Sequence, residues 1–414
     1  MRGVEYGDAN IQRTMEEDLR ERLKLGRPLR VYQGFDPTFT GLTLGNLVGL
    51  LKLRQFQRFG HEVTFLIGNM TAIVGDPSDR SAARQMLTVE QVEANARDWL
   101  QQAYRVLDPV KTIVRRNGDW LSPLTLAEVI QLASNFTVAE FLAHETFRKR
   151  MEEARPLYIH EFIYALLQAY DAYHMQTDVQ VGGSDQLFNI MAGRKLQQAL
   201  GERPLVAICT PLLIGTDGHL KMSKSVGNSI SLDESPADMY GKLMSIPDSL
   251  MVNYYTLLTD VPAVEIVALE RGLAERSVNP MDAKKRLAHS VVALLNDEAT
   301  ADAAQSEFER VFQRGQQPEE AIAVDWTGLP EGQTTAIAET ATLEVGAKPV
   351  LLTKLIADHI GVSMSEARRL IRQGAVSVDG EVTKQDVIGV KRGTVIRVGR
   401  HRFLRILGNP QADD

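Results

Sequence analysis

Apolar and polar positions along the first 225 or so residues form two alternating patterns. Short runs rich in β-branched residues, most of which end in glycine or polar residues, are separated by longer runs with a helical period. The short runs predict strands at 29–35, 62–69, 111–117, 177–183 and 204–213, and the long ones predict helices at 46–60, 88–107 and 160–175. This alternation predicts an α/β fold in which helices cover a parallel sheet. Open sheets of this kind bind ligands beyond the carboxyl ends of their strands.

The pattern changes after residue 235. Helical runs alone follow, at 235–246, 247–258, 263–273, 280–295 and 299–315, and a polar stretch comes after them. The last 65 or so residues predict two short helices, at 352–361 and 363–374, and then two hairpins that turn at Asp379-Gly380 and near Gly399-Arg400. We therefore expect a catalytic α/β domain over 1–228, an α-helical domain over 229–325, a linker over 326–347 and a small α+β module over 348–414.

The composition indicates the cellular compartment in which the protein is expected. The 414 residues are 44% hydrophobic and 24% charged, and they include a single cysteine, Cys209. One thiol cannot form a disulfide within the chain, and an apolar run around Cys209 predicts a core residue rather than a nucleophile. The charged N-terminal stretch has no apolar signal core, and no run approaches the roughly 20 apolar residues that span a bilayer. We expect a cytoplasmic protein without a membrane partner.

The net charge of −7 conceals an asymmetry. From Gly346 onward the chain has twelve Lys/Arg and seven Asp/Glu, so this segment is basic while the rest is acidic. A basic appendage on an acidic body indicates that the appendage binds a polyanion. A solubilising surface is the alternative that charge alone leaves open.

The pentapeptide Lys221-Met222-Ser223-Lys224-Ser225 is the most informative short stretch. It follows a predicted strand and precedes the helical region. Two lysines three residues apart suit a mobile loop that clasps a triphosphate, because both ammonium groups can reach anionic oxygens. Taken alone, the pentapeptide could also be a solvated surface loop.

Four other motifs precede this loop in order: YQGFDPT (32–38), GDPSDRSAAR (75–84), YALLQAYD (164–171) and VGGSDQLFN (181–189). With these motifs the chain resembles the bacterial tyrosyl-tRNA synthetases, which are class I aminoacyl-tRNA synthetases, in the branch with a Lys-Met-Ser-Lys-Ser lid. The resemblance covers nearly the whole chain. It implies a Rossmann-like catalytic domain, an α-helical anticodon-binding domain and a C-terminal RNA-binding module of ribosomal-protein type.

The spacing of Tyr164, Gln168 and Asp171 places them on one helix face. The resemblance implies that this face lines a tyrosine pocket, in which Asp171 and Tyr32 contact the substrate phenol. A pocket that leaves these groups unpaired when phenylalanine enters penalises that substrate. The tyrosine-binding residues implied by the resemblance are Tyr32, Asp76, Tyr164, Gln168, Asp171 and Gln186.

The resemblance also implies an ATP site and a phosphate-binding loop. The ATP-binding residues would be Asp36, Gly45, Gly183, Asp185 and Lys224. The catalytic residues would be Thr38, Thr43, Asn46, Arg80, Arg84, Lys221 and Lys224. The chain departs from the family at Thr43-Leu44-Gly45-Asn46, where the family has His-x-Gly-His. An asparagine amide can stand in for an imidazole N–H. Thr43 is shorter than histidine and cannot reach as far toward a developing negative charge, so we expect Arg80, Arg84 and the lid lysines to compensate for the lost donor.

The C-terminal motif EARRLIRQGAVSVDGEV (366–382) resembles the family's RNA-binding module, and Arg368, Arg369 and Arg372 would contact RNA phosphates. The resemblance implies a homodimer that uses L-tyrosine, ATP with Mg²⁺ and tyrosine tRNA, with no DNA partner and no tightly bound cofactor. Two alternatives remain open. One is an RNA-binding paralogue with weak or altered aminoacylation, which Thr43 motivates. The other is a small-molecule nucleotidyltransferase, which would need no RNA-binding appendage.

Overall fold

The computed structural model describes residues 3–76, 88–143, 145–313, 322–330, 347–399 and 402–407. The chain forms two compact units, residues 1–302 and 303–414. Each unit is described by itself.

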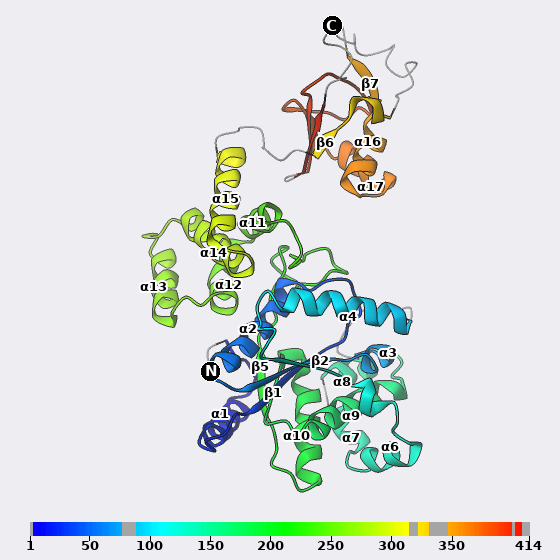
Figure 1. Cartoon of the computed structure of the whole chain (residues 1–414), viewed down its shortest axis with the longest axis vertical. Helices are drawn as coiled ribbons and strands as arrows, with labels where there is room; N and C mark the ends of the chain where they lie inside the picture. The colour runs from blue at the N-terminus through cyan, green and yellow to red at the C-terminus, as the bar shows by residue number, and fades with distance from the viewer. Residues whose placement is uncertain are drawn as a thin grey trace. The chain divides into compact units, whose positions relative to one another are not determined.

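A five-stranded parallel sheet organises the first unit (Figure 1). Its order is β3-β2-β1-β4-β5, so the order of the strands reverses between β1 and β4. The strands are β1 (Arg30–Phe35), β2 (Glu62–Ile67), β3 (Thr112–Arg116), β4 (Val179–Gly183) and β5 (Val206–Thr210). All five lie where the apolar runs predict them, and the parallel α/β fold is confirmed.

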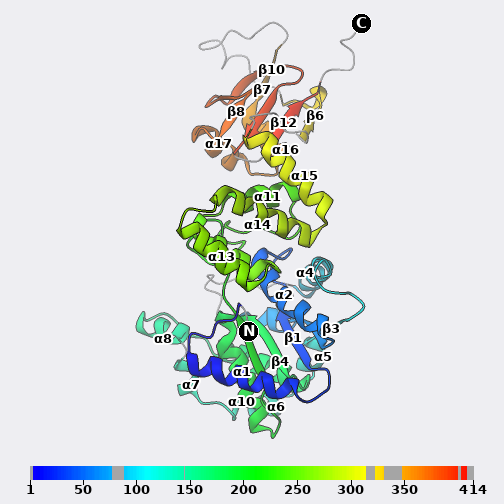
Figure 2. The same cartoon turned by 90° about the vertical axis from the view of Figure 1, so that its left-hand side faces the viewer.

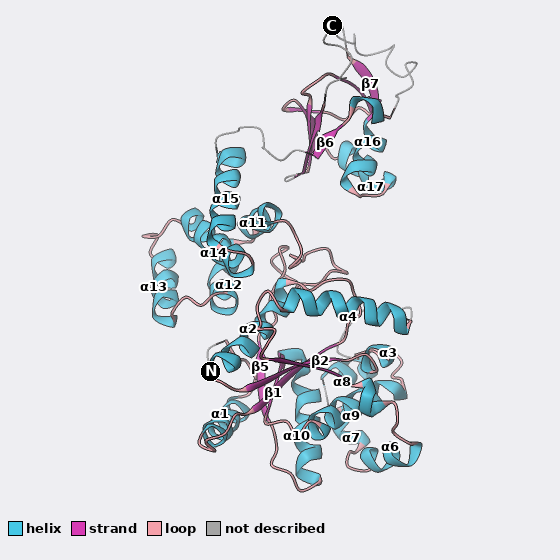
Figure 3. Ribbon diagram, in the orientation of Figure 1, coloured by secondary structure: helices cyan, strands magenta, loops and turns pink. Residues whose placement is uncertain are grey.

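Helices cover both faces of this sheet (Figure 3). Helix α2 packs on β1, β2 and β4, whereas α9 and α10 pack against each other on the opposite face. The helices of this part are α1 (Ala9–Leu23), α2 (Leu44–Arg58), α3 (Thr71–Val74), α4 (Val89–Ala103), α5 (Gly118–Leu121), α6 (Leu126–Ala133), α7 (Val138–Leu142), α8 (Glu145–Glu152), α9 (Ile159–His174) and α10 (Leu187–Ala199), with a 3₁₀ turn η1 (Ser184–Gln186).

Residues 236–313 are helical, as their period predicts. The elements are α11 (Pro236–Ser245), the 3₁₀ turn η2 (Asp248–Leu250), α12 (Met251–Leu258), α13 (Ala263–Ala274), α14 (Pro280–Leu295), α15 (Glu298–Phe308) and the π turn η3 (Glu309–Gln313). Two buried tyrosines of α12 anchor this bundle: Tyr255 Oη donates to the carbonyl of Ala283 on α14, and Tyr254 Oη donates to the carbonyl of Ile214, outside the bundle. None of the helices in the described part of the chain is long and apolar enough to cross a membrane.

The C-terminal module contains the expected helices and hairpins together with strands that the sequence pattern did not predict. Helices α16 (Leu352–Ile360) and α17 (Met364–Arg372) flank Gly361, which has a φ of 72°. The hairpin of β8 (Val376–Val378) and β9 (Glu381–Val382) turns at Asp379 and Gly380, both with positive φ, as an Asp-Gly hairpin turn requires. The other strands are β7 (Lys348–Leu351), β10 (Val387–Val390), β11 (Val395–Val398) and β12 (Arg402–Ile406).

Residues upstream of 348 also belong to this module. The short strand β6 (Ile322–Val324) pairs in parallel with β12 (Figure 2), and a 3₁₀ turn, η4 (Trp326–Gly328), follows it. Val324 and Leu329 are buried in the module's core, and Trp326 packs against it. A three-residue strand within a polar stretch has too short an apolar pattern to be recognised in the sequence.

Candidate active site

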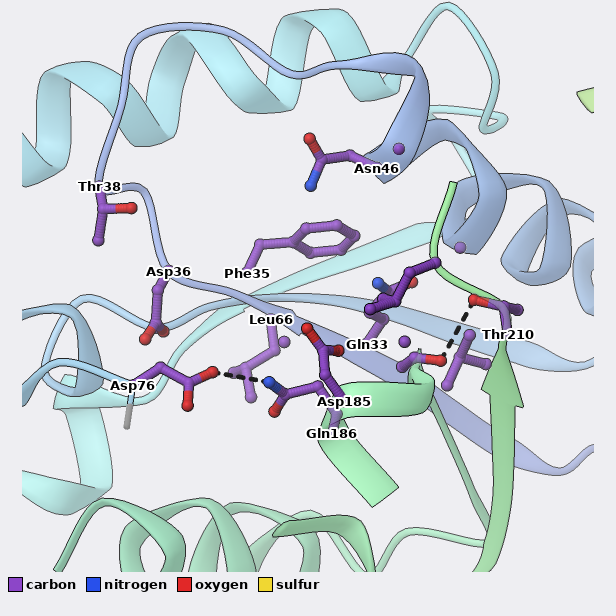
Figure 4. Close-up of a pocket in the computed structure, with 18 of the residues that line it drawn as sticks. Gln33, Phe35, Asp36, Thr38, Asn46, Leu66, Asp76, Asp185, Gln186 and Thr210 are labelled. Carbon is purple, nitrogen blue, oxygen red and sulfur yellow. Dashed lines mark hydrogen bonds between the residues drawn. The ribbon is translucent and has the colours of Figure 1, made fainter. Parts of the chain in front are cut away.

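A pocket of about 320 Å³ opens at the carboxyl ends of β1, β4 and β5, where the strand order reverses. It is lined by every described residue of the predicted tyrosine, ATP and catalytic sets, some of which Figure 4 shows projecting into the same space. Arg80 and Arg84 lie outside the described residues. The lining members of the predicted sets are Tyr32, Asp36, Thr38, Thr43, Gly45, Asn46, Asp76, Tyr164, Gln168, Asp171, Gly183, Asp185, Gln186, Lys221 and Lys224.

A buried carboxylate, Asp171, lies in this pocket on helix α9. It is 2% exposed and accepts hydrogen bonds from Trp120 Nε1 at 2.8 Å and Asn117 Nδ2 at 3.1 Å. Burial raises the pKa of Asp171 to about 8, even though both hydrogen bonds lower it. Two fixed donors therefore orient a carboxylate that is held in a low-dielectric environment.

A buried phenol, Tyr32, points to the same region from β1. Among the described residues, no hydrogen-bond partner lies within reach of Tyr32 Oη, although this oxygen is buried. Burial, and then the charge of Asp171, raises the pKa of Tyr32 well above its ordinary value. An unpaired buried hydroxyl is costly, so this pair of side chains is suited to a ligand hydroxyl that both donates and accepts.

A second pair of carboxylates lies farther along the pocket. Asp36 accepts from Tyr164 Oη at 3.0 Å and from Thr71 Oγ1 at 2.7 Å, and Asp76 accepts from Gln186 Nε2 at 2.6 Å (Figure 4). Burial, and then the charges of the nearby carboxylates, raise the pKa of Tyr164 well above its ordinary value. Two carboxylates within one pocket favour a ligand that carries a cationic group.

Residues 43–46 form the N-terminal end of helix α2. Thr43 is the N-cap residue, and its backbone N–H and Oγ1 both donate to Asn46 Oδ1, at 2.9 and 3.1 Å. The segment is also bridged to residues 230–232 by Leu44 N–H to the carbonyl of Ile230 and by Leu232 N–H to the carbonyl of Leu42, each at 2.9 Å. The start of α2 is therefore fixed both by its own cap and by hydrogen bonds to residues 230–232.

The lysine loop lies over the carboxyl end of β4. Lys221 Nζ is 2.6 Å from Asp185 Oδ2, and Lys224 Nζ donates to the carbonyl of Thr40. A Cβ at Gly183 would lie 2.6 Å from Asp185 Oδ1, so a side chain there would displace this carboxylate. The arrangement brings two cations and the carboxylate of Asp185 to the same pocket.

A family model described as tRNA synthetases class I (W and Y) matches residues 24–313. The chain belongs to this family of class I tRNA synthetases. A second model, the S4 domain, matches residues 354–395.

Relatives of this synthetase match it over nearly its whole length. The chain is 44% identical over 411 residues to a tyrosine–tRNA ligase of Moorella thermoacetica, covering 98% of this chain and 95% of that protein. It is 43% identical to a tyrosine–tRNA ligase of Thermotoga maritima, covering 95% and 94%. Among solved structures, a C-terminally truncated mitochondrial tyrosyl-tRNA synthetase of Aspergillus nidulans superposes with a TM-score of 0.59 at 25% identity, covering 71% of this chain and 89% of that one.

The three arginines predicted to contact RNA lie on α17 of this synthetase, within the S4 domain match. Arg368, Arg369 and Arg372 are all exposed. Arg369 forms a bidentate ion pair with Glu366, one helical turn away. The structure therefore presents Arg368 and Arg372 beside a paired third guanidinium on a solvated helix face.

Several residues of the synthetase's pocket were missed by sequence reasoning. Asn117 and Trp120 hold Asp171, Thr71 connects Asn117 to Asp36, and Gln33 and Gln180 line the pocket with buried amide oxygens. Asn117 and Trp120 lie more than fifty positions from Asp171 and belong to no quoted motif. Gln33 lies inside the motif YQGFDPT on β1 and Gln180 directly precedes VGGSDQLFN on β4, so only their nearness to these motifs could have indicated them.

Proposed function

We propose that the chain is a tyrosine–tRNA ligase. It activates L-tyrosine with ATP to tyrosyl-adenylate, releases diphosphate, and transfers the tyrosyl group to the 3′ end of tyrosine tRNA for protein synthesis in the cytoplasm. The observation that carries the proposal is that the Asp171–Tyr32 pair and both lysines of the lid line one and the same pocket. Relatives of 43–44% identity that are tyrosine–tRNA ligases support it.

In this proposal the buried end of the pocket selects tyrosine. Asp171 accepts a hydrogen bond from the phenol O–H and Tyr32 Oη donates to the phenol oxygen, so the buried Tyr32 hydroxyl gains a partner. Asp76, Tyr164 and Gln168 hold the α-ammonium, and Gln186 lies beside the carboxylate. Phenylalanine would leave Asp171 and Tyr32 without their partner, which is the basis of selection against it.

The open end of the pocket binds ATP together with its Mg²⁺. Asp185 accepts from the ribose hydroxyls, Gly45 and Gly183 allow close approach of the nucleotide, and Asp36 lies beside the forming adenylate. Lys221 and Lys224 move from Asp185 and Thr40 to the phosphates, and Thr38 lies near the terminal phosphate. The tyrosine carboxylate attacks the α-phosphorus and the bond to the diphosphate breaks, so catalysis consists of positioning and charge stabilisation. Arg80 and Arg84 are proposed to bind the leaving diphosphate.

The S4 domain and the helical region are proposed to bind tRNA. Exposed Arg368 and Arg372, with Arg369, provide phosphate contacts that position the RNA without reading its sequence.

A homodimer is the proposed assembly. Large apolar side chains are exposed along consecutive elements from α6 to the start of α9, and a second copy of the chain would cover them. They are Leu126, Ile130, Val138, Met151, Tyr158 and Ile159.

Tyrosine-dependent exchange between ATP and diphosphate, followed by charging of tyrosine tRNA, tests the proposal. We expect exchange with tyrosine and not with phenylalanine, and charging that depends on the S4 domain. A chain that ends before β6, at residue 321, should keep exchange and lose most charging, because the module supplies none of the residues that line the pocket. Charging without exchange would contradict the mechanism, and RNA binding with little or no exchange and charging would favour the RNA-binding paralogue with weak or altered aminoacylation.

A further inference from the structure

Thr43 and Asn46 stand where the family has two histidines, and the structure joins them in one local unit. The backbone N–H and the hydroxyl of Thr43 both donate to the same atom, Asn46 Oδ1. Thr43 is 8% exposed, and both residues line the pocket. Because a carboxamide is planar, fixing its oxygen toward Thr43 turns its nitrogen away, and Figure 4 shows the Asn46 nitrogen facing into the pocket.

The orientation of this amide follows from its chemistry. The Thr43 backbone N–H can only donate, so the Asn46 atom that meets it must be an acceptor. A flipped amide would place an NH₂ group against that N–H and would leave two donors facing each other. The cap of helix α2 therefore selects one of the two amide orientations.

The hydroxyl of Thr43 is already committed. The hydroxyl hydrogen is directed to Asn46 Oδ1. The backbone of Thr43 is bridged to that of Ser231, which limits how far the residue can move. A Cβ at Gly45 would lie 3.3 Å from Thr43 Oγ1, so the space around this hydroxyl is limited. Thr43 is thus poorly placed to serve as a second donor to a phosphate and well placed to hold its neighbour.

We infer that Thr43 is a positioning residue, which holds the Asn46 amide in the orientation that lets Nδ2 donate to the nucleotide. This inference rests on the proposed function. A donor whose direction is set before the nucleotide arrives costs no reorganisation in the transition state. The loop then offers the nucleotide one oriented donor, Asn46 Nδ2, and no second donor from Thr43.

The test is a double-mutant cycle on the full chain, followed by tyrosine-dependent ATP–diphosphate exchange. Asn46→Ala removes the donor and should lower kcat by about 10²–10³-fold. Thr43→Val keeps the shape and the backbone N–H but removes one of the two orienting bonds, and should lower kcat by about 2- to 12-fold. In the Asn46→Ala background, Thr43→Val should cause no further loss. Thr43→Ser, which keeps the hydroxyl, should lose less activity than Thr43→Val.

Asn46→Asp separates the donor from the helix cap. Its carboxylate still accepts from Thr43 and is favourable at a helix N-terminus, so the melting temperature should not fall while kcat does. Equal losses from Thr43→Val in both backgrounds would overturn the inference, because Thr43 would then act independently. Full activity of Asn46→Ala would also overturn it. Absence of exchange in the unmodified chain would instead refute the proposed function.

Discussion

The pKa of Asp171 depends on the groups that surround its side chain. Burial raises its pKa to about 8, and the bonds from Asn117 and Trp120 offset only part of that effect. Between the ordinary value of 3.8 and about 8, the folded chain holds a proton at Asp171 that the unfolded chain has lost. Stability from this group is therefore greatest at low pH and falls as pH rises through that window.

We predict that Asp171→Asn flattens the pH dependence of stability. The variant removes a contribution whose slope is at most about −1.4 kcal/mol per pH unit in the free energy of unfolding. Urea unfolding of both proteins at several values between about pH 5 and pH 8 measures the difference in slope. Identical slopes would mean that Asp171 does not have the raised pKa that its burial indicates.

Helix α4 holds the loop between β1 and α2 in place through its side chains. Its side chains bind the backbone of the segment between β1 and α2: Asn95 Nδ2 donates to the carbonyl of Pro37, Trp99 Nε1 donates to the carbonyl of Phe39, and Gln102 Oε1 accepts from Leu42 N–H. The helix is evident from its sequence period. Its partner is not, because these side chains bind main-chain groups about 60 residues away, and any sequence supplies such groups.

Strand β6 is expected to stabilise the C-terminal module. Val324 is fully buried, and its carbonyl accepts from Leu407 N–H beside β12. Val324→Ala should destabilise the module by about 2 kcal/mol, since it removes two buried methyl groups and leaves a cavity. Hydrogen exchange of the β11 and β12 amides in the full chain should become about 30-fold faster as a result.

Ile322→Ala is the matched control, because Ile322 lies on the same strand and is 43% exposed. It should change exchange of these amides little. If neither variant changes the exchange rates, the burial of the Val324 side chain does not stabilise the module.

The proposed dimer is a property of the assembled molecule. We predict that the 46.0 kDa chain sediments with about twice that mass, and that Ile130→Glu shifts it toward the monomer by placing a charge in the covered surface. Sedimentation equilibrium measures both masses. Val264→Glu, on α13 and also highly exposed, should leave the mass unchanged. A monomeric unmodified chain, or equal effects of both substitutions, would contradict the proposed interface.

The sequence by itself determined the five strands of the parallel sheet, the helical nature of residues 236–313 and the order of the motifs. Strands, helices and the Asp379-Gly380 hairpin depend on period and on local backbone preference, and neither requires knowledge of the rest of the chain. The lining of the pocket was also largely predictable, because parallel strands bring the ends that carry these motifs to one edge of the sheet. Even the link between Thr43 and Asn46 is local, since a cap joins residues three positions apart.

Tertiary structure alone decided which groups surround Asp171 and how far its pKa is raised. Trp120 and Asn117 reach it from beyond β3, and Tyr32 reaches it from β1. It also decided that residues 322–330 complete the C-terminal module. Burial and hydrogen bonds between distant residues depend on how the elements pack against one another, and no local pattern specifies that packing.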